Sequence, residues 1–559
     1  MEEKGKFHFH RHRLTPSNMS CFRCYLCCCW SYSSGIGSYW CQMCQCYFHK
    51  ECAESPLELH HHPYHPTHPL SLRPIDRAIA SICGYSGEEL GLGWAYHCQI
   101  CDFCVHLSHV REPPALEVAQ PKSHCHKLFL LPKPRPFTCD ACGLMTVPSS
   151  LPWACLECGV MIHKQCMDLP RLIRISRHPP HRLCYVPSPP PPPHESSWSC
   201  GVCRKVVHDH YGAYSCVKDD CHYVVHSKCA TRKDVWDGKD LEGEPEELED
   251  VEEPFEVIDE KTIHHFSHDH HLKLEGASFD GREHCRICAL PFCIHTGNIY
   301  SCTQSGCRFS LHETCANLSK KTWCMLHPHP LKLQANTSTI LHCEVCLRLC
   351  LGFVYTCCTE DCHFSIDVNC VSVSEPLIHI RHPHPLFSIS ISMDGKVCSV
   401  CKGQADTNGK MMECIECDFN FCFKCITLPS KVRYKQDRHP LVLGGSGEEE
   451  AAIGGGSWWC EICEGKMEPE EEMYYTCDSC CVTVHAHCIL GEEPYVKTGH
   501  YSFMWGEDDY EVAANISCCR PLCHRCGKRC PFPVVFKEND LHFCTLNCLS
   551  AFGLNIPLE

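Results

Sequence analysis

The chain has 559 residues, of which 58 are cysteine and 43 are histidine, and its formal net charge is −17. So many cysteines indicate small units held together by metal or disulfide rather than a few large hydrophobic cores. The 67 acidic residues outnumber the 50 Lys and Arg residues, which disfavours sequence-independent binding to nucleic-acid phosphates.

The N-terminal sequence, MEEKGKFHFHRHR, lacks the apolar core of a signal peptide, and no uninterrupted apolar run of about 18 residues follows it. We therefore expect an intracellular protein, cytoplasmic or nuclear, with no transmembrane segment. In a reducing compartment, regular cysteine pairs beside regular histidines favour structural zinc, and disulfides are the alternative.

One pattern recurs along the whole chain. A histidine is followed by C-x2-C, then by C-x2-C or C-x4-C, and finally by a histidine and a cysteine separated by two residues. We call each copy a module. In the first unbroken half the candidate metal ligands are His10, Cys24, Cys27, Cys41, Cys44, His49 and Cys52 (module 1); His68, Cys98, Cys101, His106 and His109 (module 2); His126, Cys139, Cys142, Cys155, Cys158, His163 and Cys166 (module 3); and His181, Cys200, Cys203, Cys216, Cys221, His226 and Cys229 (module 4).

Four further modules continue the pattern. Their candidate ligands are His268, His270, Cys285, Cys288, Cys302, Cys307, His312 and Cys315 (module 5); His329, Cys343, Cys346, Cys357, Cys362, Asp367 and Cys370 (module 6); His384, Cys398, Cys401, Cys414, Cys417, Cys422 and Cys425 (module 7); and His439, Cys460, Cys463, Cys477, Cys480, His485 and Cys488 (module 8). Asp367 and Cys422 replace the second histidine with other zinc-binding residue types, which favours metal coordination.

Module 2 is the weak copy. Its first cysteine pair survives only as Cys83, with Ser86 in the partner position, and His109 stands where the other modules have their last cysteine. We expect one of its two sites to be poor or empty.

Apolar residues repeat in step with the ligands. Two positions before the second pair stand large residues, namely Tyr39, Tyr96, Trp153, Tyr214, Tyr300, Tyr355, Met412 and Tyr475, and alternating apolar positions follow the pair. This alternation predicts short strands with one buried face. Each module can bury only a small core, so metal binding, worth about 10 to 16 kcal/mol per structural zinc, must supply much of its stability.

The order of these motifs resembles the C1 domain, the zinc module of diacylglycerol and phorbol-ester receptors. The His-Pro-Leu openings at His68, His329, His384 and His439 resemble its divergent plant branch, the Cys/His-rich DC1 proteins. The resemblance implies small zinc-stabilised α+β modules in tandem, with short antiparallel strands, a short helix and two interleaved zinc sites per module. In that family the first pair binds with the HxxC pair, and the opening histidine binds with the second pair and one late ligand.

The late cysteine of the better-known family members is mostly missing here. Twelve positions after the last cysteine of modules 3, 5, 6, 7 and 8 stand His178, His327, His382, Asp437 and His500, and His65 lies one residue further from Cys52. We therefore predict that the first residue of each double-histidine element closes one module and the second opens the next. Two alternatives remain: one histidine is a linker residue, or both bind one zinc, because alternate side chains of an extended segment share a face.

The repeat predicts a division of the chain into modules and connecting segments. Modules 1 to 4 cover residues 8–60, 61–120, 121–178 and 179–232, the last with a proline-rich insert. An acidic linker at 233–262, read as an unstructured spacer over Asp234 to Glu260, precedes modules 5 to 8 at 263–326, 327–381, 382–437 and 438–500. Module 8 carries the glycine-rich insert Gly444 to Gly456, and residues 501–559 form an element with a four-cysteine zinc site at Cys523, Cys526, Cys544 and Cys548.

The favoured function is a non-catalytic array of structural zinc modules that acts as a protein-interaction and signalling scaffold, because four protein ligands leave zinc no open position. A diacylglycerol-responsive lipid module is one alternative: the loop Leu144 to Pro152 is apolar, but the loops of modules 7 and 8 are polar or acidic. A RING- or PHD-like ubiquitin ligase would need a further C-x2-C within the unit. A thiol-disulfide oxidoreductase would need a β-α-β context.

Overall fold

The computed structural model describes residues 7–553 except for residues 32–36, 76–81, 102, 112–114, 147–149, 194–196, 247–251, 277–283, 291, 293–296, 336–340, 390–394, 404–409, 435, 445–457, 469–471, 503–508 and 516–519. The chain divides into two compact units, Met1–Pro245 and Glu246–Glu559. Nearly all of the predicted glycine-rich insert lies outside the described residues, as do the cysteines at 518 and 519.

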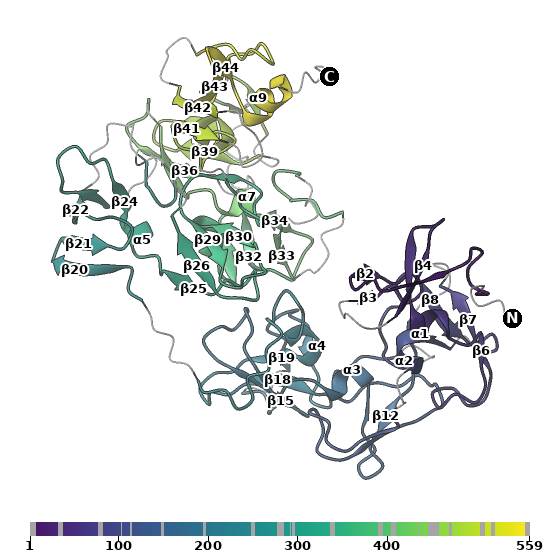
Figure 1. Ribbon diagram of the computed structural model, residues 1–559. Helices are drawn as coiled ribbons and strands as arrows, with labels where there is room; N and C mark the ends of the chain where they lie inside the picture. Colours follow the sequence, from purple (N-terminus) through teal and green to yellow (C-terminus); the bar gives the residue numbers. More distant parts are fainter. Residues whose placement is uncertain are drawn as a thin grey trace. The chain divides into compact units, whose positions relative to one another are not determined.

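Every module folds into a small antiparallel sheet followed by a short helix. Figure 1 shows this arrangement in module 5, where β22 (Leu272–Glu275) and β24 (Ser310–His312) lie near α5 (Glu313–Ala316). The predicted fold class is therefore confirmed. The one-turn helices begin directly after the ligand position of the HxxC motif, so that His49, for example, is the N-cap residue of α1 (Lys50–Ala53). A four-residue helix is marginal alone. Its value here is that residues three apart lie on one side of it, which brings His49 and Cys52 together.

The first unit holds modules 1 to 4. Module 1 contains β1 (Thr15–Ser17), β2 (Phe22–Arg23), β3 (Trp30–Ser31), β4 (Ser38–Cys41), β5 (Cys46–His49) and α1 (Lys50–Ala53); module 2 contains β6 (Glu58–Leu59), β7 (Leu70–Pro74), β8 (Trp94–His97), β9 (Cys104–His106) and α2 (Leu107–Arg111). Module 3 contains β10 (Glu117–Val118), β11 (Leu128–Leu130), β12 (Trp153–Ala154), β13 (Met161–Ile162) and α3 (Lys164–Met167); module 4 contains β14 (Leu172–Ile173), β15 (Leu183–Val186), β16 (Trp198–Ser199), β17 (Val206–Val207), β18 (Ala213–Cys216), β19 (Val224–His226) and α4 (Ser227–Ala230).

The second unit holds modules 5 to 8 and the C-terminal element. Module 5 contains β20 (Phe255–Asp259), β21 (Thr262–His265), β22 (Leu272–Glu275), β23 (Ile299–Cys302), β24 (Ser310–His312) and α5 (Glu313–Ala316); module 6 contains β25 (Lys321–Thr322), β26 (Leu331–Gln334), β27 (Leu341–His342), β28 (Leu349–Cys350), β29 (Val354–Cys357), β30 (Ser365–Asp367) and α6 (Val368–Val371). Module 7 contains β31 (Leu377–His379), β32 (His382–Phe387), β33 (Met411–Cys414), β34 (Asn420–Cys422) and α7 (Phe423–Ile426); module 8 contains β35 (Lys431–Arg433), β36 (Pro440–Leu443), β37 (Trp458–Trp459), β38 (Lys466–Met467), β39 (Tyr474–Cys477), β40 (Val482–His485) and α8 (Ala486–Leu490). The C-terminal element contains β41 (Gly499–Ser502), β42 (Asp509–Ala514), β43 (Val534–Glu538), β44 (Leu541–Phe543) and α9 (Leu546–Gly553).

The strand order explains how each module connects to the one before it. In module 7 the order is β31-β32-β33-β34, and the edge strand β31 comes directly after the helix of module 6. The edge strands β6, β10, β14, β25 and β35 have the same place in their sheets. Each of these sheets therefore begins N-terminal to the double-histidine element at which the sequence repeat was divided.

The large residue before the second cysteine pair has a second role besides filling the core. Tyr96, Tyr214, Tyr355 and Tyr475 are buried on the inner strands β8, β18, β29 and β39. Their hydroxyls donate hydrogen bonds of 2.6 to 2.7 Å to the backbone carbonyls of Pro56, Pro170, Ser319 and Pro429, respectively. The tyrosine thus fixes the chain that enters each sheet and satisfies its own buried hydroxyl.

The acidic run is more ordered than predicted. Val235 is fully buried, and Trp236 forms a β-bridge with Ile175 of module 4. Residues Phe255–Asp259 form β20, the edge strand of the five-stranded sheet of module 5. The prediction of an unstructured spacer over the whole run is wrong for these two parts, because apolar residues among the charges give each part a surface to pack on. Residues 247–251, between them, lie outside the described residues.

Buried residues in the second unit extend across module boundaries. One hydrophobic cluster contains buried side chains of modules 5 to 8, and another joins the C-terminal element to Leu349 and Leu351 of module 6. Leu351 also donates its backbone N–H to the carbonyl of Tyr495 at 3.2 Å. None of the helices within the described residues is long and apolar enough to span a membrane.

Candidate metal centres

The first cysteine pair of a module lies beside its HxxC pair; we call this group the first cluster. In modules 1 and 3 the four ligand atoms all lie within 4.8 Å of one another. The histidine faces the sulfurs through Nδ1, at 3.3 Å from Cys27 in module 1 and 3.4 Å from Cys142 in module 3. The equivalent Nδ1 atoms of His226, His312 and His485 lie 3.2 to 3.4 Å from Cys203, Cys288 and Cys463.

Backbone geometry supports the thiolate form of these cysteines. The N–H of His49, His163, Asp367 or His485 donates to the first cysteine sulfur of its own module, at 3.4 Å in each case. In the second pair, the first sulfur accepts an N–H from a residue just after it, for example from Glu416 to Cys414 at 3.3 Å. Donors aimed at sulfur favour the charged, metal-binding state.

The replaced ligands in modules 6 and 7 occupy the same place as the histidines. Asp367 is buried, and its Oδ2 lies 3.3 Å from the sulfur of Cys346. Its Oδ1 accepts the N–H groups of Asn369 and Cys370, which caps α6, and burial raises the pKa of this carboxyl to about 7, with a further contribution from Cys343. In module 7 the sulfur of Cys422 lies 3.6 Å from that of Cys401.

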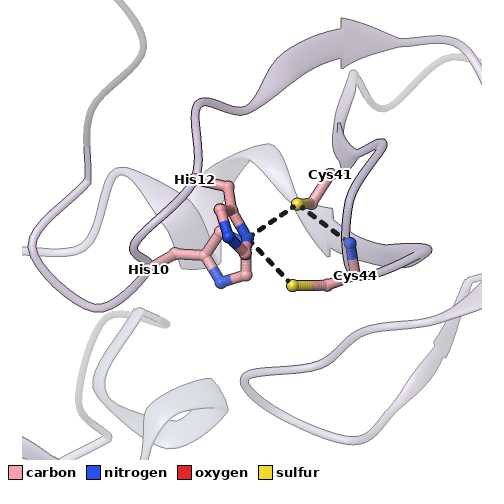
Figure 2. A group of neighbouring side chains, drawn as sticks. All are labelled: His10, His12, Cys41 and Cys44. Atoms are coloured by element: carbon pink, nitrogen blue, oxygen red, sulfur yellow. Dashed lines mark hydrogen bonds between the residues drawn. The ribbon is translucent and has the colours of Figure 1, made fainter.

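The second cysteine pair lies beside both residues of the double-histidine element; we call this group the second cluster. Figure 2 shows it in module 1, where His10, His12, Cys41 and Cys44 come together (Figure 2). Nδ1 of His12 lies 3.1 Å from Cys44 and 3.8 Å from Cys41. Modules 2 and 3 contain the same arrangement, formed by His65, His68, Cys98 and Cys101 and by His124, His126, Cys155 and Cys158.

The predicted sharing of histidines between modules is therefore wrong. His382, predicted to close module 6, has its Nε2 3.5 Å from Cys417 of module 7, while Nδ1 of His384 lies 3.7 Å from Cys414. The two histidines lie on the same strand, β32, two residues apart, so their side chains share one face and reach one site. The alternative in which both bind the same metal fits this geometry.

The other predicted closing ligands follow the same correction. His178 lies 3.4 Å from both Cys216 and Cys221 of module 4, and His327 lies 3.5 Å from Cys362 of module 6. His268, predicted as a ligand of module 5, lies 3.2 Å from Cys302 of that module. The Oδ1 of Asp437 lies 3.1 Å from Cys480, and Nδ1 of His439 lies 3.2 Å from the same sulfur. His500 lies instead on β41, exposed and opposite Glu511.

Two candidate ligands were missed by the sequence pattern, His12 and His124. Each pairs with a histidine two positions away, His10 and His126, which the repeat did identify. The signal was present, since a histidine two or three residues from another recurs at nearly every module start. In the second cluster the first histidine uses Nε2 and the second Nδ1, as His65 and His68 illustrate with Cys101 at 3.2 and 3.6 Å.

Burial of the imidazole rings, and polar contacts of the ring nitrogens that face away from the clusters, favour metal binding by these histidines. Burial lowers the pKa of His178 to about 4, helped by the charge of His181, so the neutral ligand form dominates at neutral pH. The ring nitrogen of His485 that faces away from the cluster lies 3.1 Å from Glu472, and that of His226 lies 3.0 Å from the carbonyl oxygen of Val206. Such outer contacts orient a metal-binding histidine.

The predicted four-cysteine group of the C-terminal element is also assembled. The sulfur of Cys544 lies 3.7 Å from that of Cys526 and 3.5 Å from that of Cys548. Cys523 is buried beside them at the start of the C-x2-C turn, where its carbonyl accepts the N–H of Gly527 at 2.9 Å. Four thiolates at this spacing fit a structural zinc site.

Thiol and imidazole donors in groups of four fit tetrahedral zinc, and the many clusters are consistent with multiple metal sites. A family model described as C1 domain matches residues 63–108, 122–167, 176–230, 266–316 and 435–489, and a model described as C1 domain-like, C-terminal, matches residues 510–549. No curated protein and no solved structure matches the chain. Each matched C1 segment begins just before a double-histidine element or its Asp437 counterpart, in agreement with the side-chain geometry. The chain is thus a tandem C1-like, Cys/His-rich protein, in which several C1 domains of the DC1 type are followed by a C1-like C-terminal domain.

Proposed function

We propose that this chain is a non-catalytic array of zinc-stabilised modules that serves as a scaffold for protein partners. The observation that carries the proposal is that each complete cluster draws four ligands from the chain itself, as Cys139, Cys142, His163 and Cys166 do. A zinc ion held by four protein ligands has no open position for substrate or activated water. Membership of the C1 family, whose modules are generally non-catalytic, supports the same conclusion.

Zinc content tests the metal part of the proposal. Elemental analysis of the purified full chain should give about two zinc ions per complete module, plus one for the C-terminal cysteines. Cobalt substitution should give the absorption of tetrahedral thiolate sites. A content near one ion per module would mean that only one of the two clusters binds metal.

Partner binding tests the scaffold part. Proteins labelled by proximity in cells should bind the purified zinc-loaded chain directly, and binding should be lost when the metal is removed and restored when it is returned. Absence of direct binding by every labelled candidate would contradict a scaffold. Dithiol-dependent disulfide reduction or ubiquitin transfer by the zinc-loaded chain would favour the enzyme alternatives.

Lipid binding is a second candidate because of one loop in module 3. Leu144 is 53 % exposed and Met145 is 76 % exposed, although the middle of the loop, residues 147–149, lies outside the described residues. Two exposed apolar side chains could enter a bilayer surface. Sedimentation with liposomes that contain diacylglycerol tests this, with Met145→Glu as the variant; lack of diacylglycerol-dependent sedimentation of the unmodified chain would exclude it.

A further inference from the structure

The first cluster of module 2 has three ligands where the first clusters of the other modules have four. The sulfur of Cys83 lies 3.5 Å from Nδ1 of His109, and the side chains of His106 and Ser86 also lie within hydrogen-bonding reach of this thiol. The two imidazole rings lie 5.3 Å apart. The fourth position, which holds a cysteine in the other modules, holds Ser86.

Ser86 is a poor substitute for that cysteine. Its hydroxyl donates to Oε2 of Glu88 and accepts the backbone N–H of the same residue, both at 3.3 Å. A neutral hydroxyl already engaged in this way is not among the usual protein ligands of zinc. The module therefore keeps three strong ligands, with neither a cysteine nor a histidine at the fourth position.

The two sides of this cluster differ in how they are covered within the described residues. Tyr85 covers His109, with ring centroids 5.4 Å apart, and is itself stacked on Tyr64 at 4.1 Å. The turn after Ser86 is open by comparison: Gly87 has a positive φ, a Cβ built on it would meet nothing within 4 Å, and Glu88 is exposed. Ser86 itself is buried, so we take the exposed turn beside it as the side from which a small ligand enters.

Charge decides which small ligand fits. One thiolate and two neutral imidazoles leave a site with Zn²⁺ at a net charge of about +1, whereas three thiolates and one imidazole bring it to about −1. An anionic donor is therefore favoured at the fourth position. A thiolate would make the site neutral and would complete the two-cysteine, two-histidine set that structural zinc sites commonly use.

We propose that module 2 binds zinc through Cys83, His106 and His109 and takes its fourth ligand from outside the chain, as the thiolate of a small thiol. This rests on the proposed zinc binding of the array. The thiol gives its proton to solvent as its sulfur binds, so the step needs no oxidant or reductant. Because one ligand is exchangeable, this zinc is released faster than the zinc of the complete clusters.

The test uses the full-length protein and 2-mercaptoethanol as the probe. In the cobalt-substituted chain, the thiol should raise the thiolate-to-metal charge-transfer absorbance by the amount of one thiolate per chain. In Ser86→Cys, which restores the C-x2-C spacing, the absorbance should start one thiolate higher and should not respond. Equal responses in both proteins, or none in either, would overturn the proposal.

Zinc release gives an independent measurement. With a chromophoric chelator, about one zinc ion per chain should leave the unmodified protein at least tenfold faster than the corresponding zinc ion leaves the Ser86→Cys variant. Ser86→Ala and Cys104→Ser should both keep this fast zinc, since neither residue is a ligand in the proposal. If either variant loses it, that residue is the fourth ligand and the proposal is wrong. A chain that holds no zinc before the chelator is added would instead contradict the proposed zinc binding itself.

Discussion

The imidazole of His382 lies flat against the ring of Phe419, with centroids 4.1 Å apart and an interplanar angle of 9°. The same parallel stack joins the first histidine of the second cluster to an aromatic residue two positions after the last cysteine of the pair in four other modules: His65 on Phe103, His178 on Tyr223, His268 on Phe309 and His327 on Phe364. In module 8, where Asp437 replaces the histidine, the equivalent position is Val482. The stack fixes the plane of the ring and hence the direction of the nitrogen that faces the sulfurs.

Loss of the stack should weaken metal binding at the second cluster. Phe419→Leu keeps an apolar side chain but removes the ring against His382. We expect a loss of about 0.5 to 1.5 kcal/mol in zinc affinity, the usual value of an aromatic pair, and faster alkylation of Cys414 and Cys417. Val160→Leu, at the equivalent position of module 3, which has no stack, is the matched control. Equal effects of the two substitutions on their own clusters would show that the stack contributes nothing.

Removal of one histidine should affect the module that follows it in sequence. In His382→Ala, Cys414 and Cys417 of module 7 should become reactive toward iodoacetamide, because their cluster loses a ligand 3.5 Å from Cys417. Cys357 and Cys362 of module 6 should stay protected. Mass spectrometry of the alkylated peptides measures both pairs in one sample, and protection of module 7 with exposure of module 6 would restore the shared-ligand model.

The difference between those two models explains what the spacing could predict and what it could not. Alternation of apolar residues predicts the short strands, because it is a local property of the chain, whereas the short helix was expected from the resemblance to the C1 domain. The position of His382 is different. It lies twelve residues after Cys370 and two before His384, so its distance along the chain suits either module. The antiparallel pairing of β32 with β33 places His382 beside the cysteines of module 7 and so decides between the two modules.

Two further features cannot be predicted from composition and pattern: the ordered parts of the acidic run and the stacking role of Phe419. The acidic run reads as a solvated spacer because charged residues dominate it, yet Val235 is fully buried and Phe255 begins a strand. The contacts that order these residues come from parts of the chain distant in sequence or from a neighbouring strand, and average charge does not report them. In the same way, the role of Phe419 as a stacking partner follows from geometry, whereas the sequence pattern indicates only an apolar position.

Asp367 should be needed for its charge rather than for its cap. Asp367→Asn retains a side-chain oxygen that can accept the N–H groups of Asn369 and Cys370, so α6 should form as before. The amide is a much weaker zinc ligand than a carboxylate or an imidazole. We therefore expect selective alkylation of Cys343 and Cys346, with the second cluster of module 6 intact. Full protection of these two cysteines would show that zinc is held without the carboxylate.

Removal of metal should unfold the modules rather than leave empty folded sites. The sheets have strands of two to six residues and helices of mostly four or five, which are too short to be stable alone. Apparent binding energies of about 10 to 16 kcal/mol per structural zinc exceed what such small cores supply. Chelation should therefore abolish the β-sheet signal in far-ultraviolet circular dichroism and expose the cysteines of both clusters, and added zinc should restore the signal and protect the cysteines again.

Unfolding of the second unit should be cooperative, because one buried hydrophobic cluster extends across modules 5 to 8. Proteolysis during partial chelation should therefore yield either the intact second unit or its complete degradation, rather than single modules. Accumulation of stable single-module fragments would show that the shared core contributes little.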